Sequence, residues 1–335
     1  MSTSPVALER LREIITAYYG LGEVALPEPL AAVHQRRHQK LVVQTDAGKF
    51  LAKTYERDPA VLDALRFQHR LSDHLHGNGL PVARIQPTRE GTRIVKQDTW
   101  ALELQEFISG GSMRITPKTL EIGANALGRF HAVCRDFPCP PRDATKWRFS
   151  EAPRWAFGKL YEAARNHGEP ADCDALCNDI ALFLHEAANA LKPEKRAEFE
   201  TGLIHGDWHA GNLIFQGDAL AAIVDLEFAG DGCYLEDLAY AMSNLCIRTA
   251  IEPPRLEART QALLKHYQVY RTLAYAEEAA LYYAVGIKHI TTVAYQFIQL
   301  NEWIAGYSPF EWLQRLSAQC HWLKQQAARV RWGDA

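Results

Sequence analysis

The sequence predicts an α+β protein of two lobes, with a sheet-rich first lobe and a mainly helical second lobe. Short apolar runs separated by turn residues dominate the chain before Ser109-Gly-Gly111, and apolar residues at helical spacing dominate after it. A chain of 335 residues is long enough for two parts that each bury a core. We therefore expect an N-terminal lobe over residues 1–107 and a C-terminal lobe over residues 108–335.

The first lobe is expected to hold an antiparallel sheet and one long helix after its first hairpin. Asp46-Ala-Gly48 lies between two apolar runs and has the residue types of a hairpin turn. Pro59 suits the first turn of a helix, because its missing N–H has no helical partner there. The expected elements are helices over 5–19 and 59–76 and strands over 41–45, 49–55, 92–96 and 99–107.

The second lobe is expected to be helical apart from one small hairpin. Gly217-Asp218 separates two short apolar runs, which indicates a tight turn between strands. The expected elements are helices over 120–134, about 176–191 and 280–298, and strands over 212–215 and 221–224.

Composition and charge exclude several classes of protein. The net charge is −3, and neither lobe has the basic excess typical of a phosphate-backbone binder, so nucleic acid is not an expected partner. No apolar run approaches the ~20 residues of a membrane span, and the N-terminus lacks an apolar signal segment. Seven scattered cysteines suit reduced thiols, so we expect a cytoplasmic protein without a membrane partner.

The residues that carry chemistry lie between His205 and Glu227. Asp207 is followed by Asn212 five residues later and by Asp225 after the predicted hairpin. Phosphoryl transfer needs a carboxylate to orient and deprotonate the attacking hydroxyl, and hard oxygen ligands to hold Mg²⁺ against the nucleotide phosphates. A loop carrying Asp207 and Asn212, followed by a hairpin ending at Asp225, predicts that arrangement, with Glu227 as a weaker candidate ligand.

A lysine in the first lobe offers the other half of a nucleotide site. Lys53 lies within an apolar predicted strand, where an ammonium is costly unless it is paired or faces a ligand. Alone, such a lysine would be read as an edge-strand residue that reaches solvent. Its place before a helix and upstream of the Asp207, Asn212 and Asp225 set favours contact with phosphate.

These motifs resemble a known family. His205-Gly-Asp-Trp-His-Ala-Gly-Asn212 with Val224-Asp-Leu-Glu227 is similar to the phosphotransferases that include aminoglycoside phosphotransferases, choline kinases, type II homoserine kinases and methylthioribose kinase. The resemblance implies a protein-kinase-like fold. It extends in the family's order to Phe50-Leu-Ala-Lys53, Gly79-Leu-Pro-Val82, Leu104–Gly110, Leu127–His131 and Tyr234–Tyr240.

The resemblance also implies roles and cofactors. ATP and Mg²⁺ would be the cofactors, and the acceptor would be a small-molecule alcohol. Asp207 would be the catalytic base, and His205 and Asp237 would brace its loop. The remaining implied roles are Mg²⁺ ligation by Asn212 and Asp225, phosphate contact by Lys53, and adenine contact by the backbone of Glu106 and Ile108.

Two departures from the family pattern bear on the first lobe. Relatives often carry a glutamate on the first-lobe helix as partner of the lysine, but this chain offers Gln68 there, with Asp63 as the nearest substitute. The segment expected to cover the phosphates, 34–40, contains no glycine whose backbone amides could approach them freely. Its cations Arg36, Arg37 and Lys40 would either contribute charge or form a solvated turn.

Three functions remain open from the sequence. A small-molecule kinase is favoured over a protein Ser/Thr kinase, because only about ten residues separate Asp225 from the next predicted helix, too few for a peptide-binding segment. A catalytically weak nucleotide-binding module is disfavoured by the intact Asp207, Asn212 and Asp225. The acceptor could be a homoserine-like amino alcohol, a sugar or an aminoglycoside, and the sequence does not indicate an oligomeric state.

Overall fold

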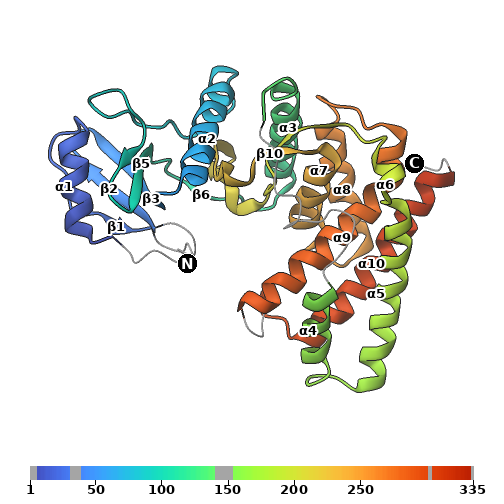
Figure 1. Ribbon diagram of the computed structural model, residues 1–335. Helices are drawn as coiled ribbons and strands as arrows, with labels where there is room; N and C mark the ends of the chain where they lie inside the picture. The colour runs from blue at the N-terminus through green and yellow to red at the C-terminus, as the bar shows by residue number, and fades with distance from the viewer. Residues whose placement is uncertain (1–5, 31–38, 140–153, 301–303, 333–335) are drawn as a thin grey trace. The chain divides into compact units, whose positions relative to one another are not determined.

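The computed structural model of the chain describes residues 6–30, 39–139, 154–300 and 304–332, and it divides into two compact units (Figure 1). The first unit contains residues 1–112 and 213–227, and the second contains residues 113–212 and 228–335. The hairpin that follows Asn212 therefore groups with the N-terminal residues. The single lobe boundary at Phe107 stays a prediction.

An antiparallel five-stranded sheet forms the centre of the first unit, in the order β1-β2-β3-β5-β4. Its strands are β1 (Glu28–Pro29), β2 (Gln39–Thr45), β3 (Gly48–Glu56), β4 (Val95–Lys96) and β5 (Trp100–Glu106). The predicted β2–β3 hairpin is confirmed, and its turn is closed by the Thr45 hydroxyl, which donates to the Gly48 carbonyl at 3.0 Å. Gly48 has a φ of 122°, which a residue with a Cβ rarely adopts.

Two helices accompany this sheet. Helix α1 (Leu8–Tyr18) buries Leu11 and Ile15 in one apolar cluster with residues of β2, β3 and β5. Helix α2 (Pro59–Gly77) begins at Asp58, whose carboxylate accepts hydrogen bonds from the backbone of Ala60 and Val61. This cap satisfies N–H groups that have no partner within the helix.

A small three-stranded sheet completes the first unit. Its order is β6-β8-β9, formed by β6 (Gly111–Ser112), β8 (Leu213–Gln216) and β9 (Ala219–Ile223). The backbone N–H of Ile223 donates to the Pro81 carbonyl at 2.8 Å, and Ile223 also forms a parallel bridge with Val82. These contacts fix the end of β9, and with it Asp225, to the segment that follows α2.

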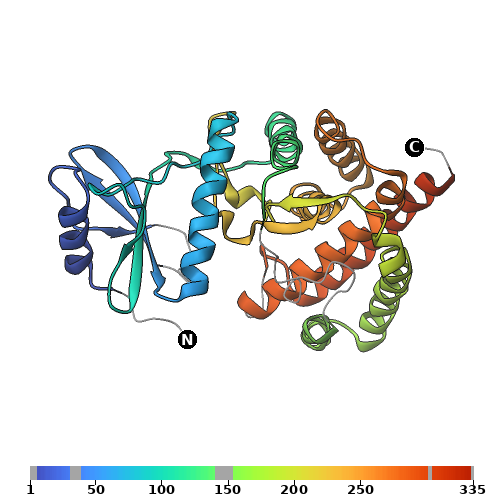
Figure 2. The ribbon, with the colours of Figure 1, turned by 45° about the horizontal axis from the view of Figure 1, so that its top comes forward.

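Helices dominate the second unit, as the sequence predicts. They are α3 (Pro117–Val133), α4 (Arg154–Ala164), α5 (Pro170–Ala190), α6 (Pro193–Arg196), α7 (Tyr234–Met242), α8 (Pro253–Tyr267), α9 (Tyr275–Leu300) and α10 (Pro309–Trp332). Helix α9, orange in Figure 2, packs against α4, α5, α7 and α10. Gly286 of α9 meets the ring of Phe183 in α5, where a Cβ would have no room.

Two features of the second unit escaped the sequence prediction. Strands β7 (Thr201–Ile204) and β10 (Gly230–Cys233) pair antiparallel, and the segment that holds Asp207, Asn212 and Asp225 lies between them in the sequence. A π-helical turn, Ser243–Ile247, continues α7. Within the described ranges, no helix combines the length and apolar character needed to cross a membrane.

Candidate active site

Lys53 and Asp225 meet in the first unit. The Nζ atom of Lys53 lies 3.1 Å from Oδ1 of Asp225, and Nζ of Lys40 lies 2.9 Å from both carboxylate oxygens. Lys40 and Lys53 are register partners on β2 and β3, so both ammoniums project from one place on the sheet. Asp225 follows β9 with a φ of 58°, a left-handed conformation that turns the chain sharply at this carboxylate.

The two lysines keep the Asp225 carboxylate charged. Burial alone would raise the pKa of Asp225, but the ammoniums of Lys53 and Lys40 outweigh it and hold that pKa well below its usual value. The pKa of Lys53 is raised in turn, because the attraction of Asp225 and Glu103 exceeds the effect of burial. The Asp225 carboxylate and the Lys53 ammonium thus lie side by side in fixed positions, where each can contact a ligand of opposite charge.

The structure corrects two expectations about these cations. Asp63 is not the partner of Lys53, because its carboxylate is exposed and pairs with Arg66 on the same helix. Lys40 is not part of a solvated turn, since it lies in β2 with its ammonium on Asp225. Arg36 and Arg37 lie outside the described residues.

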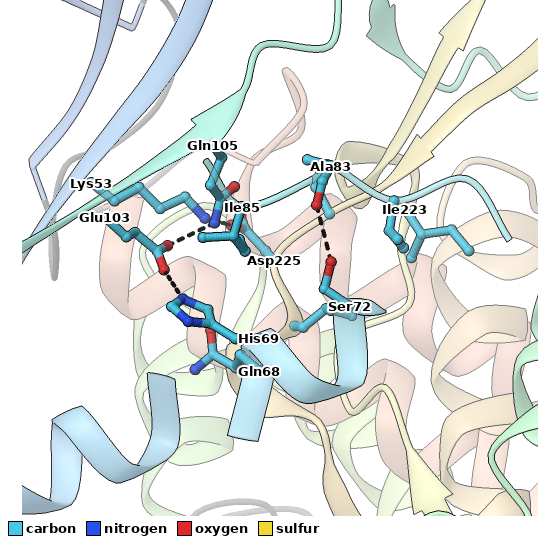
Figure 3. A pocket seen from close by; sticks show the side chains of 13 residues that line it. Lys53, Gln68, His69, Ser72, Ala83, Ile85, Glu103, Gln105, Ile223 and Asp225 are labelled. Atoms are coloured by element: carbon cyan, nitrogen blue, oxygen red, sulfur yellow. Dashed lines mark hydrogen bonds and ion pairs between the residues drawn. The ribbon is translucent and has the colours of Figure 1, made fainter. Parts of the chain in front are cut away.

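A pocket opens beside Lys53 within the first unit (Figure 3). Its walls come from β3, α2, β5, the segment after α2 and the end of β9. Gln68 and His69 reach it from α2, Glu103 and Gln105 reach it from β5, and Asp225 closes another side. These charged and amide groups share the lining of the pocket with apolar side chains, among them Val82, Ile85 and Ile223.

The predicted adenine contacts lie at the end of β5. Glu106 is the last residue of that strand, and its backbone N–H already donates to the Arg84 carbonyl at 2.8 Å. The N–H and C=O of one strand residue point to the same edge, so the Glu106 carbonyl faces away from β3. That oxygen, with the backbone of Ile108 two residues on, stays the predicted contact for the adenine edge.

Asp207 and Asn212 meet in the second unit. The Asn212 amide nitrogen donates to the Asp207 backbone carbonyl at 2.9 Å and to Oδ2 of the Asp207 side chain at 3.0 Å. The hydroxyl of Tyr240, on α7, donates to Oδ1 of Asp207 at 2.8 Å. His209 places Nε2 3.4 Å from Oδ2. The carboxylate is therefore held in one orientation by groups from two segments.

A buried aspartate braces the loop that carries Asp207. Asp237 accepts hydrogen bonds from the backbone N–H groups of His205 at 2.8 Å and Gly206 at 2.9 Å. It also lies 3.0 Å from Nε2 of His131, a buried residue of α3. His205 is itself fully buried. The bracing roles predicted for Asp237 and His205 fit these contacts, which fix the path of the chain into Asp207.

The surroundings of Asp207 favour its ionised form. Burial would raise its pKa, but the hydrogen bond and charge of His209, together with the hydrogen bond from Tyr240, lower it below its usual value. An ionised carboxylate can accept a proton from an attacking hydroxyl and orient that hydroxyl beforehand. This is the chemistry expected of Asp207.

The residues predicted to bind metal fit a magnesium ion by their chemistry. Both amide hydrogens of Asn212 have partners on Asp207 in reach, so its carbonyl Oδ1 is the atom left for a cation. Asp225 offers a carboxylate that stays ionised. Mg²⁺ needs only one or two such protein ligands beside phosphate and water oxygens. Asn212 belongs to the second unit and Asp225 belongs to the first unit.

The sequence reasoning missed Glu103 and Tyr240, and it named Lys40 only as a cation of the segment expected to cover the phosphates. The strand register would have identified Lys40 and Glu103. Each lies directly opposite Lys53 once the β2–β3 and β3–β5 pairings are known. The signal for Tyr240 is its position three residues after Asp237 on one helix, which places it on the same side as the brace.

The fold and these two clusters define a kinase-type phosphotransferase. Residues 29–275 match the family model described as the phosphotransferase enzyme family, and the chain belongs to that family. Its reaction is transfer of a phosphoryl group to a hydroxyl of a small molecule. The predicted resemblance and the predicted class of enzyme are thereby confirmed.

Similar sequences and similar solved structures are consistent with membership of this family. Homoserine kinase of Nitrobacter winogradskyi is 27% identical over 280 residues, covering 82% of this chain and 79% of that protein. Homoserine kinase of Methylobacterium nodulans is 29% identical and covers 71% of this chain and 70% of that protein.

The structure resembles that of an aminoglycoside phosphotransferase from Alicyclobacillus acidocaldarius, with a TM-score of 0.73 at 17% identity, covering 99% of this chain and 97% of that one. It also resembles a microcompartment-associated aminopropanol kinase, with a TM-score of 0.68 at 15% identity, covering 97% of this chain and 100% of that one. These likenesses confirm the predicted protein-kinase-like fold.

Replacing Tyr240 with phenylalanine should shift the acidic limb of the kcat–pH profile to higher pH. The Tyr240 hydroxyl donates to ionised Asp207 and so helps to lower the pKa of that carboxyl. Removing the donor raises the pKa, so Asp207 becomes protonated at a higher pH and activity is lost earlier on acidification. The pH–rate profiles of the two enzymes test this, and coincident acidic limbs would contradict it.

Proposed function

We propose that the protein is an ATP- and Mg²⁺-dependent kinase that transfers the γ-phosphoryl group to the hydroxyl of a small amino alcohol carrying a carboxylate, such as homoserine. The observation that carries the proposal is the Asp207 carboxylate, held ionised and oriented by Tyr240, Asn212 and His209. Such a base suits hydroxyl activation in phosphoryl transfer, and the β8–β9 hairpin joins its loop to the second fixed carboxylate, Asp225.

Each residue of the proposed site would have a separate role in binding or catalysis. Lys53 would hold the α- and β-phosphates, and Glu106 and Ile108 would present backbone groups to adenine. Asn212 and Asp225 would hold Mg²⁺, which neutralises charge on the phosphates when bound. Asp207 would orient the acceptor hydroxyl and take its proton onto a carboxylate oxygen as the oxygen attacks.

The acceptor class is supported by a row of polar residues that starts at Tyr240. Asn244 donates from its amide to the Tyr240 carbonyl at 3.0 Å, one turn further along the helix. Arg248 follows after another turn, where its backbone N–H closes the π-helical bond to Ser243 at 2.9 Å. Tyr240, Asn244 and Arg248 therefore follow one another along one face, and π-helical turns of this kind are frequent at functional sites.

The guanidinium of Arg248 is positioned to bind an anionic group of the acceptor. Its side chain is partly buried, and burial lowers its pKa while Tyr240 is the nearby group that opposes this effect. In the part of the chain that the structure describes, its guanidinium makes no hydrogen bond or ion pair. An acceptor with its hydroxyl at Asp207 and a carboxylate toward Arg248 would supply the missing partner, and the homoserine kinases among the relatives act on such a molecule.

Replacing Arg248 with methionine should raise the KM for homoserine by about 10–10²-fold, the range expected for a lost hydrogen bond between charged groups. The KM for 3-aminopropanol, which is homoserine without its carboxylate, should change little. Steady-state kinetics with both acceptors, and with a sugar and an aminoglycoside, test the proposal in the wild type and in the variant. Arg255→Met, at an exposed position of α8, is the matched control.

Equal KM changes for homoserine and 3-aminopropanol would remove Arg248 from the acceptor site. Turnover of a sugar or an aminoglycoside far above that of homoserine would overturn the proposed acceptor class.

A protein kinase fits less well. Residues 226–233 separate Asp225 from the first residue of α7, and four of these form β10 paired with β7. Little chain is left to hold a peptide.

A further inference from the structure

The carboxylate that faces Lys53 from its own sheet is Glu103. The two residues are direct partners in the antiparallel register of β3 and β5, so their side chains project from the same face. Both are buried, with Glu103 only 1% exposed. Gln68 of α2 lines the same pocket and supplies an amide and no charge.

Three donors fix the Glu103 carboxylate. The Tyr55 hydroxyl donates to Oε1 at 2.7 Å, and the Gln105 amide donates to the same oxygen at 2.7 Å. Nε2 of His69, on α2, lies 2.6 Å from Oε2 (Figure 3). Burial would raise the pKa of Glu103, but His69 and Lys53 outweigh it and lower the pKa. A carboxylate with this many partners cannot turn away from Lys53 without breaking them.

Lys53 therefore has two carboxylates of different kinds. Asp225 is the predicted metal ligand, and its oxygens are shared with Lys40. Glu103 belongs to the β3–β5 ladder, lines the same pocket as Asp225 and is held by its own network. A buried ammonium needs a fixed negative charge nearby, and Glu103 supplies one directly opposite Lys53 in the strand register.

We propose that Glu103, positioned by His69, is the permanent counter-ion that holds Lys53 toward the nucleotide phosphates. The proposal rests on the proposed function, because a nucleotide is the ligand that Lys53 serves. It makes the lysine–carboxylate pair a feature of the β3–β5 ladder, whereas in protein kinases that pair joins a strand to a movable helix.

The experiment separates this role from a purely structural one. Glu103→Gln keeps the size of the side chain and removes its charge. We expect the Kd for ADP or for a non-hydrolysable ATP analogue, measured by titration without acceptor, to rise at least ~10-fold, about 1.4 kcal/mol. Adding Gln68→Glu returns a carboxylate to the same pocket from α2 and should recover most of that loss. Glu56→Gln, at an exposed end of β3, is the control.

Every result of these nucleotide titrations either supports or overturns the proposed role of Glu103. Unchanged nucleotide affinity in Glu103→Gln, or a loss that Gln68→Glu does not recover, overturns the proposal. If Glu103→Gln does not fold, the double variant Glu103→Gln/Gln68→Glu, which keeps one carboxylate in the pocket, is titrated instead, and a nucleotide Kd at least ~10-fold above that of the wild type overturns the proposal. A wild-type protein that binds no nucleotide would refute the proposed function instead, which keeps the two failures distinguishable.

Discussion

Asp207→Asn is expected to lower kcat by at least ~10²-fold, the usual minimum for losing a general base, and to leave nucleotide affinity near that of the wild type. Asparagine keeps the size of the side chain and can still contact Tyr240 and Asn212, so the loop should keep its path. What is lost is the carboxylate that we propose accepts the proton of the attacking hydroxyl. A contact that matters mainly in the transition state lowers kcat more than it weakens binding.

Nucleotide titration and single-turnover transfer, measured on the same preparation, test this expectation. Asp231→Asn is a suitable control, because Asp231 is exposed on β10 within the same unit. A variant that loses nucleotide binding but keeps its transfer rate would show that the catalytic loop has been assigned wrongly. Lys53→Ala should give the opposite pattern, since the proposed partner of Lys53, the nucleotide, is present in both the ground state and the transition state.

The elements that depend on local sequence were predictable. The β2–β3 hairpin follows from its turn residues, and α2 follows from Pro59 and its apolar spacing. Strands β7 and β10 were not predictable, because Gly230-Asp-Gly-Cys233 has little strand propensity and is extended only through its pairing with Thr201–Ile204. The stability of these strands comes from partners distant in sequence.

The residues of the candidate site also fall into two groups: those that local sequence predicts and those that depend on strand pairing. Asp207, Asn212 and Asp225 follow from one motif, and Lys53 follows from an ammonium within an apolar strand. The residues around them depend on register. Nothing near Glu103 in the sequence indicates that it lies opposite Lys53, because a shift of one residue in the β3–β5 pairing would turn its side chain to the other face.

Asp225→Ala should reduce metal-dependent turnover by at least ~10²-fold, the upper end of what disturbing a metal's surroundings costs. The variant loses the carboxylate predicted to bind Mg²⁺ and leaves the ammoniums of Lys40 and Lys53 without their shared partner. Turnover as a function of Mg²⁺ concentration measures the first effect, and turnover equal to that of the wild type would remove Asp225 from the site.

The second effect of Asp225→Ala is a change in how stability depends on pH. The pKa of Asp225 is lower in the folded protein than the ~4 of an unfolded chain, so its ion pairs stabilise the fold above pH ~4 and are lost as the pH falls through the folded value. Asp225→Ala should therefore flatten the acid limb of the stability curve. The double variant Lys40→Met/Asp225→Ala separates the two effects, because it removes one of the unpaired cations. It should regain stability relative to Asp225→Ala and regain no turnover, and recovered turnover would mean that Asp225 acts only as a partner of Lys40.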